Sequence, residues 1–383
     1  MIEVRAPTTL RDNSPRDPSE GQPVPDPLDV ADLRVRVQAV LDTAQARQRD
    51  VLAPLGPDVA ELSDGIFQLL RGGKRLRAAF LYWGYRAAGG RDSAALVQVA
   101  TSMEMFQAAA LIHDDVMDHS DTRRGMPTAH RRLAARHARE GWEGDGEDFG
   151  NAGAILAGDL CLVWTDELFV GSGLPHAELA RGRDQFDAMR TQLMGGQFLD
   201  VLDSVRDWAT LTTDQRIEEA LRVVRYKSAN YTVVQPLLIG ADCAGVDAST
   251  RSALAAYGTA LGDAFQLRDD LLGVFGDPEQ TGKPAGDDLL EGKRTALVAF
   301  ALDDVAPADL SRFTALFGSP DLDEEQVAWL RDLCKRSGAV DRVEGMIQER
   351  VLVAREQLRG AVLDEESAVI LHDLIDVATA RDS

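Results

Sequence analysis

Three aspartates in the first third of the chain, Asp114, Asp115 and Asp118, have the spacing of a divalent-cation site. They end an apolar stretch with helical periodicity. On a helix Asp114 and Asp118 lie about 40° apart and one turn along the axis, so they share a face. Two carboxylates on one face repel each other unless a cation lies between them. Because Mg²⁺ takes a few carboxylate oxygens and fills its other positions with water and phosphate, the pattern predicts a magnesium-bound phosphorylated substrate.

The residues on either side separate this hypothesis from its alternative, a chance pattern on a solvated acidic face. A solvated face needs no apolar residues upstream, yet the stretch before Asp114 is apolar. Two adjacent arginines, Arg123 and Arg124, follow the carboxylates in a turn-forming segment. Arginine binds phosphate through two parallel hydrogen bonds, so both flanks favour a binding site.

A second aspartate pair and a basic cluster combine the same charges elsewhere in the chain. Asp269 and Asp270 also follow an apolar helical stretch, and Lys283 and Lys293 come after them. In the cluster at residues 72–77, two glycines let the backbone approach an anion and three cations could hold phosphate. The cluster lacks the spacing of a nucleotide P-loop and so does not indicate ATP. A basic helix start facing solvent is its alternative interpretation.

Helices are expected to position these residues, because apolar residues recur every three or four positions over most of the chain. One helix should begin after Asp92, a plausible N-cap. Alternating patterns are rare, so no sheet is expected. Glycines and prolines mark breaks, and residues 141–150 are interpreted as a loop. The fold class predicted is all-α, with one domain at residues 28–383 and helices over residues 28–49, 152–170, 177–203, 214–226, 249–275, 324–336, 340–359 and 365–380.

Composition excludes several function classes. The net charge of −22 argues against a nucleic-acid partner. No apolar run reaches the about 18 residues of a membrane span. Residues 1–27 hold six of the fifteen prolines, which predicts a disordered arm and not a secretory signal. Cys161, Cys243 and Cys334 lie far apart and form no metal-ligand pattern, which favours buried thiols in a cytoplasmic protein.

Together these motifs resemble the trans-isoprenyl diphosphate synthases, or polyprenyl synthetases, and among them the bacterial geranylgeranyl diphosphate synthases. The resemblance covers residues 72–295 and implies a single-domain helical bundle of the isoprenoid synthase type around a central apolar cavity. The matching positions are Gly72 to Arg77 with Ala78 in place of the usual proline, Asp114 to Asp118, Arg123 to Gly125, Gly158 and Asp159, Gly196, Gln197 and Asp200, Lys227 and Ser228, Phe265 and Gln266, Asp269 and Asp270, Lys283 and Lys293.

The resemblance implies a head-to-tail condensation of isopentenyl diphosphate with a dimethylallyl, geranyl or farnesyl diphosphate, catalysed by a homodimer. Three Mg²⁺ ions are the family expectation. Asp114, Asp118 and Asp269 would bind the metal, with Asp115 and Asp270 in support. Arg123, Lys227 and Lys283 would neutralise the departing diphosphate. The remaining substrate-binding residues implied are Lys74, Arg77 and Arg124 for the second diphosphate, Gln107 where many relatives have histidine, Gln266 and Lys293.

Two features depart from the family pattern. Gly273 occupies the fifth position of the second aspartate-rich motif, where relatives have an aspartate that helps to place one metal ion. We expect weaker metal affinity on this side with activity retained, and Asp277 as a possible helper. Residues 136–150 form a longer loop than in compact relatives, and a surface insertion is favoured over a lid across the site.

Product length should depend on the depth of the apolar tunnel below the first motif. Ala110 and Ala109, four and five residues before Asp114, leave space there, and Phe106 is the candidate floor one turn deeper. These residues predict geranylgeranyl diphosphate (C20), with farnesyl diphosphate or a product of C25 or more as alternatives. Replacing Ala109 by phenylalanine should shorten the product. Close helix packing is the alternative explanation for the alanines.

Three other functions are less consistent with the motifs. A class I terpene cyclase shares the first motif but needs no second diphosphate site, so the cluster at residues 72–77 argues against it. A non-catalytic synthase subunit would normally lose one aspartate motif, and here only Gly273 departs. A metal phosphohydrolase built on His113 and Asp114 would need further histidines at helical spacing, which the six in the chain do not supply. His113 is expected to have a structural role.

Overall fold

The computed structural model describes residues 27–276, 286–303, 305–319 and 321–380. The regular secondary structure of the described residues is helical apart from one antiparallel pair of two-residue strands, β1 (Thr122–Arg123) and β2 (Met126–Pro127). The prediction of an all-α fold is therefore confirmed. The predicted N-terminal arm, except for Pro27, lies outside the described residues, as do Asp277 and Lys283.

The helices follow one another through short connections, and most of the predicted ones are found with bounds shifted by a few residues. In chain order they are η1 (Val30–Asp32), α1 (Leu33–Leu52), η2 (Ala53–Leu55), η3 (Pro57–Val59), α2 (Ala60–Leu69), α3 (Leu76–Ala87), α4 (Ala94–Met117), α5 (Ala129–Glu140), α6 (Gly146–Val170), α7 (His176–Val205), η4 (Trp208–Thr210), α8 (Thr213–Val223), η5 (Val224–Val234), α9 (Gln235–Ala244), α10 (Ala248–Phe275), α12 (Asp287–Leu290), α13 (Ala296–Ala301), α14 (Pro307–Leu316), α15 (Glu324–Arg336), α16 (Ala339–Gly360) and α17 (Glu365–Thr379).

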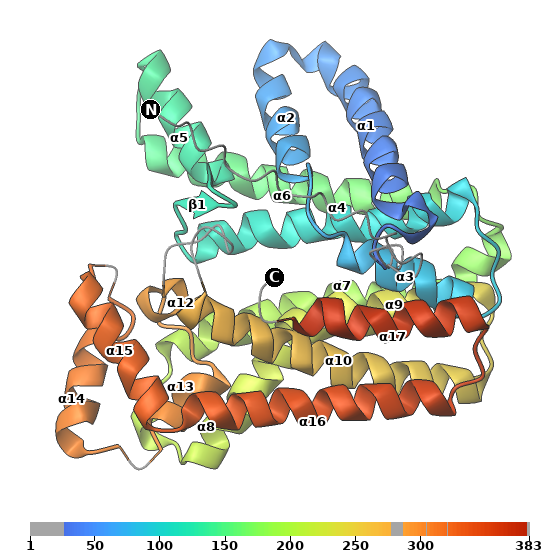
Figure 1. Ribbon diagram of the computed structural model, residues 1–383. Helices are drawn as coiled ribbons and strands as arrows, with labels where there is room; N and C mark the ends of the chain where they lie inside the picture. Colours follow the sequence, from blue (N-terminus) through green and yellow to red (C-terminus); the bar gives the residue numbers. More distant parts are fainter. Residues whose placement is uncertain (1–26, 277–285, 304, 320, 381–383) are drawn as a thin grey trace, which may run out of the picture.

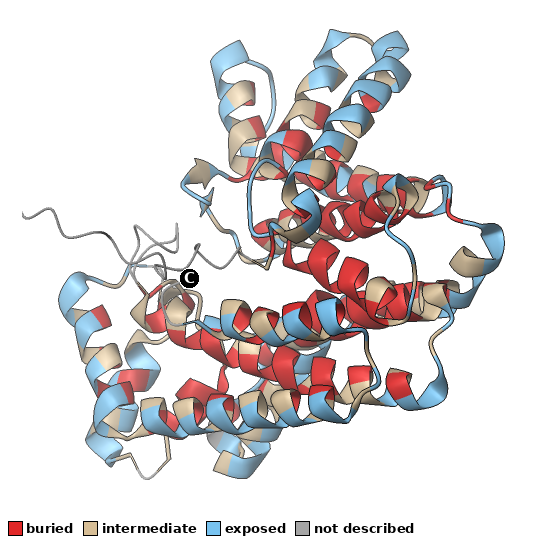
Figure 2. Cartoon of the chain, turned by 45° about the vertical axis from the view of Figure 1, so that its right-hand side comes forward, coloured by how far each residue is buried: buried red, intermediate tan, exposed pale blue. Residues whose placement is uncertain are grey.

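The long helices pack side by side around two apolar clusters (Figure 1). α4 packs on α6, α3 on α9, and α10 on both η5 and α16. The larger cluster joins the side chains of α1, α3, α4, α6, α9 and α10, and the smaller one joins the C-terminal half of α10 to α13 and α15. Figure 2 shows that buried residues gather in the central helices, whereas the outer ends of the helices at the top are largely exposed. The core therefore fixes α4, α7 and α10, which carry the acidic residues Asp114, Asp200 and Asp269.

α4 presents the first aspartate-rich motif at its C-terminal end. It begins after Ser93, whose hydroxyl accepts a hydrogen bond of 3.1 Å from the backbone N–H of Leu96. The prediction of Asp92 as N-cap is wrong by one residue, because Asp92 forms an ion pair of 2.7 Å with Arg36. Among the described helices α4 alone is long and apolar enough to cross a membrane, but 72% of its most apolar window is buried inside the protein. The apolar character of α4 is that of a core helix.

The segment predicted as a long loop is mostly helical. α5 ends at Glu140 and α6 begins at Gly146, so only five residues connect them. Gly141 ends α5 with φ of +64°, and the Asp145 side chain accepts a hydrogen bond of 2.8 Å from the N–H of Glu147. The glycines and acids that suggested a loop are thus helix caps. No residue of 136–150 lines the central cavity.

Candidate active site

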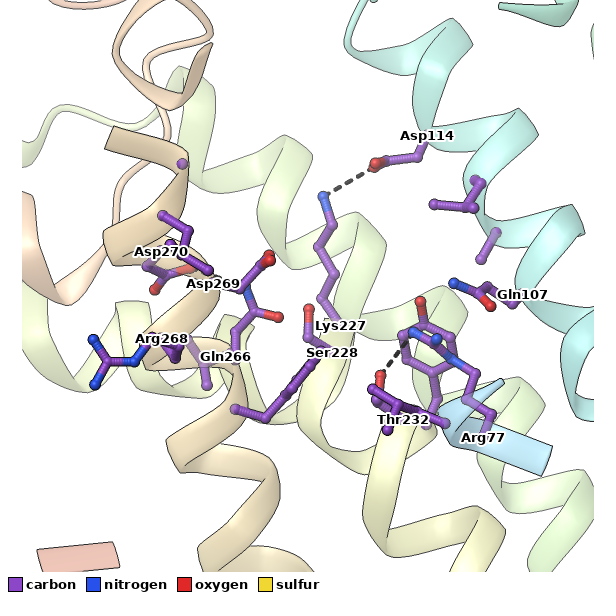
Figure 3. A pocket seen from close by; sticks show the side chains of 18 of the residues that line it. Arg77, Gln107, Asp114, Lys227, Ser228, Thr232, Gln266, Arg268, Asp269 and Asp270 are labelled. Atoms are coloured by element: carbon purple, nitrogen blue, oxygen red, sulfur yellow. Dashed lines mark hydrogen bonds and ion pairs between the residues drawn. The ribbon is translucent and has the colours of Figure 1, made fainter. Parts of the chain in front are cut away.

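A cavity of about 650 Å³ opens between α3, α4, α7, η5 and α10. Asp114 and Asp269, far apart in the sequence, both line it, as does the basic cluster that precedes α3. Figure 3 shows Asp114 and Asp269 on opposite sides of this space, with Lys227 between them. The predicted site residues in its wall are Lys74, Arg77, Gln107, Ala110, Asp114, Arg123, Arg124, Lys227, Gln266, Asp269, Asp270 and Lys293.

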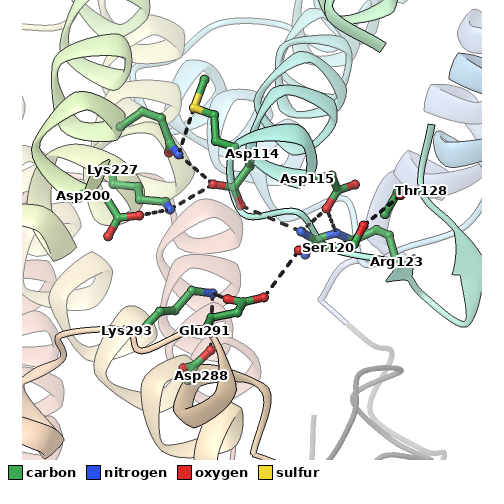
Figure 4. A network of polar contacts seen from close by, with 12 residues as sticks. Asp114, Asp115, Ser120, Arg123, Thr128, Asp200, Lys227, Asp288, Glu291 and Lys293 are labelled. Carbon is green, nitrogen blue, oxygen red and sulfur yellow. Dashed lines mark hydrogen bonds and ion pairs between the residues drawn. The ribbon is translucent and has the colours of Figure 1, made fainter. Parts of the chain in front are cut away.

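The first acidic cluster surrounds the ammonium group of Lys227 (Figure 4). This group donates hydrogen bonds to Asp114 Oδ1 at 3.0 Å and to Asp200 Oδ2 at 2.5 Å. Gln197 Nε2 donates to the same oxygen of Asp114 at 2.8 Å. Burial alone would raise the pKa of Asp114, but the charges of Lys227 and Lys293 outweigh it and hold this pKa far below its usual range. Asp114 is therefore an ionised carboxylate at neutral pH.

Asp114, Asp118 and Asp200 form a group that fits a hard divalent cation. One carboxylate oxygen from each lies within 4.8 Å of the others, and all three side chains are half-buried. Asp114 and Asp200 line the cavity, and Asp118 lies beside them outside its wall. Carboxylate oxygens are the donors that Mg²⁺ prefers. Asp114 and Asp118 thus lie together as their helical spacing predicted. Asp200, for which no role was predicted, joins them from α7.

Asp118 leads to a prediction of pH dependence for the metal-free protein. Burial and the neighbouring charge of Asp114 raise the pKa of Asp118 from 3.8 to about 7. Between pH 4 and 7 the folded protein therefore keeps a proton that the unfolded chain has lost, and stability falls as pH rises through this window. Asp118→Asn removes the titrating group. As the pH rises from 4 to 7, the Tm of the wild type should therefore fall relative to that of the variant by on the order of 3 °C.

Thermal unfolding in a chelating buffer measures this difference. Mg²⁺ is the control, because a cation bound by the ionised Asp118 would restore the stability of the wild type but not that of the variant. A difference in Tm that stays constant from pH 4 to 7 without metal would contradict the proposed repulsion between Asp118 and Asp114.

The second aspartate of the first motif points away from the cavity. Asp115 is 1% exposed and accepts hydrogen bonds from the guanidinium of Arg123, one of them 2.9 Å long from Nε. Arg123 also lies 3.8 Å from Asp114 Oδ2. Arg123 is therefore oriented by Asp115 and still reaches the cavity wall, so Asp115 can support the site without binding the metal.

The second acidic cluster lies at the C-terminal part of α10. Gln266 Nε2 donates to Asp270 Oδ1 at 2.9 Å and lies 3.3 Å from Asp269 Oδ2. Burial raises the pKa of Asp270 well above its usual value. Burial alone would lower the pKa of Lys293, but Asp288 and its other acidic neighbours keep it well above its usual value. Lys293 thus supplies a positive charge between the two acidic clusters.

All three cations of the cluster at residues 72–77 line the cavity, but one of them is already paired with a carboxylate. Arg77 donates a hydrogen bond of 2.8 Å to Thr232 Oγ1 and stacks over the ring of Tyr231, 4.2 Å from its centroid. Arg75, one of the three cations expected to hold phosphate, forms a buried ion pair with Glu104 at 3.5 Å. Its charge is therefore already compensated inside the protein.

Arg124 lies beside this cluster in a strongly positive environment. Its guanidinium donates to the Leu69 carbonyl at 3.2 Å and would lie 3.4 Å from a Cβ on Gly73, where φ is +87°. Burial lowers the pKa of Arg124, and although the charge of Glu104 opposes this, the charges of Arg75, Arg123 and Arg77 lower it further. Because these neighbouring cations repel one another, an anionic ligand between them would be stabilising, which agrees with a second diphosphate site.

The three residues predicted to set product length occupy different environments. Ala110 lines the cavity, whereas Ala109 is fully buried in the apolar core and is not part of the cavity wall. Phe106 is also buried and packs edge-on against Tyr231, with 6.3 Å between the ring centroids. His113 lies 3.1 Å from the Ile155 carbonyl and packs over Gly158, outside the cavity wall, as expected for a structural residue.

Four polar residues near the acidic clusters had no assigned role in the sequence: Gln197, Asp200, Asp288 and Glu291. Gln197 and Asp200 belong to neither aspartate-rich motif. Both stand in the segment 196–200 that matches the family pattern, and this match was the available signal. Glu291 Oε2 forms an ion pair with Lys293 Nζ at 2.7 Å, and Glu291 Oε1 accepts a hydrogen bond from Ser120 Oγ at 3.4 Å. Glu291 therefore joins the segment after α10 to the end of the first motif. No pattern in the sequence marks that contact.

Comparison with known proteins agrees with this fold and site. The family model described as polyprenyl synthetase matches residues 59–334. The chain therefore belongs to the polyprenyl synthetase family, and it is a prenyltransferase of isoprenoid biosynthesis.

The chain is similar to relatives that are named for products of different length. The geranylfarnesyl diphosphate synthase of Aeropyrum pernix is 32% identical over 326 residues, which cover 84% of this chain and 94% of that protein. A (2E,6E)-farnesyl diphosphate synthase of Mycobacterium tuberculosis is 35% identical over 230 residues, covering 60% and 57%. A solved geranylgeranyl pyrophosphate synthase of Corynebacterium glutamicum, complexed with isoprenyl diphosphate and magnesium, has a TM-score of 0.85 at 39% identity, covering 93% and 99%. The products named for these relatives differ in length.

Proposed function

We propose that the protein condenses isopentenyl diphosphate head-to-tail with an allylic diphosphate, with Mg²⁺ as cofactor, and that its main product is geranylgeranyl diphosphate. One observation carries this proposal: two acidic helix ends and two sets of cations line the same cavity. The acidic residues can hold a metal-bound diphosphate, while the cations at α3 can hold a second one. A cavity with both sites suits the joining of two diphosphates better than the cyclisation of one.

The metal is assigned from the donor set. The oxygens of Asp114, Asp118 and Asp200 approach within 4.8 Å, and Asp270 Oδ2 is buried with no hydrogen-bond partner among the described residues. Asp114, Asp118 and Asp269 would hold Mg²⁺ as the sequence predicted, with Asp200 as a further ligand. Bound there, Mg²⁺ would neutralise the negative charge that grows on the leaving diphosphate.

The protein side chains act on the charges that change during the reaction. Lys227, Lys293 and Arg123 lie where a diphosphate held at the acidic clusters would leave, and positive groups there stabilise the transition state more than the ground state. Lys74, Arg77 and Arg124, with Gln107, would hold the diphosphate of isopentenyl diphosphate. The apolar residues below Asp114 would surround the hydrocarbon tails and keep water from the allylic cation.

Purified protein tests the proposal when it is incubated with Mg²⁺, labelled isopentenyl diphosphate and each allylic diphosphate in turn. We expect chain extension, release of pyrophosphate and a C20 product as the main species. Release of a hydrocarbon would indicate a cyclase, and no turnover with any allylic substrate would indicate a non-catalytic subunit. A main product of C25 or C15 would correct the chain length and retain the reaction.

The depth of the cavity gives a prediction about product length. Ala110 lines the cavity wall one turn before Asp114, so Ala110→Phe should fill the space and shift the main product from C20 to C15. Ala109→Phe should also shorten the product if its ring reaches the cavity, but Ala109 is fully buried, so overpacking should cost this variant about 1–3 kcal/mol of stability. Product chromatography and thermal unfolding separate the two effects. An unchanged product from Ala110→Phe would contradict the tunnel assignment.

A homodimer is also part of the proposal. α6 and α7 each carry a row of exposed apolar side chains, among them Leu156 and Val163 at 57% and Phe198 at 64% exposed. Apolar surface of this extent is typical of an interface. The mass of the purified chain in solution, measured by light scattering, tests this assignment.

A further inference from the structure

Four residues of the cavity wall lie on the π-helix η5, whose backbone hydrogen bonds span five residues instead of four. Figure 3 shows Lys227, Ser228 and Thr232 along this stretch of helix. Thr232 accepts a hydrogen bond from Arg77, whose guanidinium also stacks over the fourth residue, Tyr231. The register of η5 therefore determines where groups proposed for both diphosphates point.

A single side-chain oxygen on α7 accepts hydrogen bonds from both residues that close the last turn of η5. The backbone N–H of Gln235 donates to the carbonyl of Asn230, five residues earlier. The side chains of the same two residues both donate to Gln192 Oε1, Asn230 Nδ2 at 3.3 Å and Gln235 Nε2 at 3.1 Å. An amide oxygen has two lone pairs, so Gln192 can accept both bonds.

These two bonds depend on the π-helical register. On an α-helix, residues five apart point about 140° away from each other, so two such side chains could not reach one oxygen. In a π-helix the backbone bond brings the residue five positions on into the next turn, close to the same face. Gln192 therefore contacts Asn230 and Gln235 together only while η5 keeps this bond.

The helix that follows η5 is fixed against α3, so it cannot rotate to compensate. A Cβ on Gly84 would lie 2.1 Å from the Leu237 carbonyl oxygen. One on Gly240 would lie 2.0 Å from the Leu81 carbonyl oxygen. The backbones of α3 and α9 thus touch at two points. Loss of the π-helical register would rotate η5 itself, by about 100° for each residue removed from its turns.

We propose that Gln192 is a positioning residue that holds η5 in its π-helical register and so directs Lys227, Tyr231 and Thr232 into the cavity. Gln192 is not part of the cavity wall, so it acts through η5. The proposal rests on the proposed function, since it concerns the residues of that site, but the register of η5 can be measured without turnover. A rotated η5 would carry Lys227 away from the acidic cluster and Thr232 away from Arg77.

Three variants and one control separate this role from general packing. Gln192→Met keeps the length of the side chain and removes the accepting oxygen, whereas Gln192→Glu keeps an oxygen that can accept both bonds. Asn230→Ala removes one of the two donors. Thr191→Val is the matched control, because the Thr191 hydroxyl donates to the Asp187 carbonyl at 3.0 Å, a hydrogen bond that stays within α7. Thermal unfolding checks that each variant is folded.

Hydrogen–deuterium exchange at the backbone amides of η5, measured by mass spectrometry on the substrate-free protein, reports the register. A neutral hydrogen bond changes an opening equilibrium by about 3- to 10-fold. We therefore expect exchange in η5 to be faster by that factor in Asn230→Ala, which loses one bond, and by about tenfold or more in Gln192→Met, which loses two. Gln192→Glu and Thr191→Val should exchange like the wild type.

The condensation assay then measures the effect on the site. Gln192→Met should lower kcat by about 10²-fold, because a misplacement of about 1 Å costs that much and Lys227 is moved. It should also raise the KM for isopentenyl diphosphate by about tenfold, because Arg77 loses its hydrogen bond to Thr232. Gln192→Glu should restore both constants, and Thr191→Val should leave them unchanged.

Two results would overturn the inference. Wild-type exchange and kinetics in a folded Gln192→Met protein would show that the oxygen does not hold the register. A loss in Gln192→Glu as large as in Gln192→Met would show that the shape of the glutamine, and not its accepting oxygen, is what matters. If the wild type itself catalyses no condensation, the proposed function fails, whereas the exchange comparison still decides whether Gln192 holds the register of η5.

Discussion

Lys227→Met should lower kcat/KM for the condensation by about 10²- to 10³-fold, the loss typical when one preorganised charge is removed from an active site. The ammonium group of Lys227 lies between Asp114 and Asp200, whose side chains are 16% and 25% exposed. Without it, two half-buried carboxylates face each other and the low pKa of Asp114 loses a main cause. Asp114 would then hold a proton more readily and bind a cation less well.

Steady-state kinetics over a range of Mg²⁺ concentrations separate the two roles of Lys227. If the ammonium stabilises charge on the leaving diphosphate, kcat falls and the KM for the allylic substrate changes little. If it only orders Asp114 and Asp200, raising the Mg²⁺ concentration should restore much of the rate. Lys335→Met is the matched control, since Lys335 is exposed on α15 near the ring of Phe275. Near wild-type kcat/KM in Lys227→Met would refute the assignment of Lys227 to the site.

The sequence predicted the acidic helix ends because their signal is local. Asp114 and Asp118 share a helix face, and the apolar period of α4 and α10 determines which direction that face points. The cavity between them follows from packing α4 against its neighbours, which the family resemblance implied and helical periodicity alone did not. Arg75 shows the limit of charge as a signal. In sequence it is one cation among three, and only the fold brings Glu104 to it.

Contacts between distant segments could not be predicted from the sequence for the same reason. Asp288 is separated from Gly273 by residues 277–285, and nothing local to either position indicates that one fills the space of the other. The α5–α6 connection was predicted too long because its caps, Gly141 and Asp145, have the composition of a loop. The helix predicted over residues 214–226 stopped short of the π-helix η5, which continues to Val234.

Two adjacent glycines on α7 make the placement of Lys227 testable. A Cβ on Gly196 would lie 2.4 Å from the carbonyl carbon of Tyr226 and 2.5 Å from the backbone nitrogen of Lys227. These are backbone atoms, so they cannot rotate away as a side chain would. The π-helix η5 can approach α7 at this point only because position 196 has no side chain. A Cβ on Gly195 would meet nothing within 4 Å.

Gly196→Ala should therefore move η5, and the ammonium of Lys227 with it, away from Asp114. A misplacement of about 1 Å can cost about 10²-fold in rate, and we expect a loss of that size in kcat, with overpacking costing about 1–3 kcal/mol of stability. Gly195→Ala introduces the same methyl group one residue earlier and should keep full activity, with Tm unchanged or higher because alanine favours the helix. If both variants kept wild-type kcat, the close approach of η5 to α7 would not be what positions Lys227.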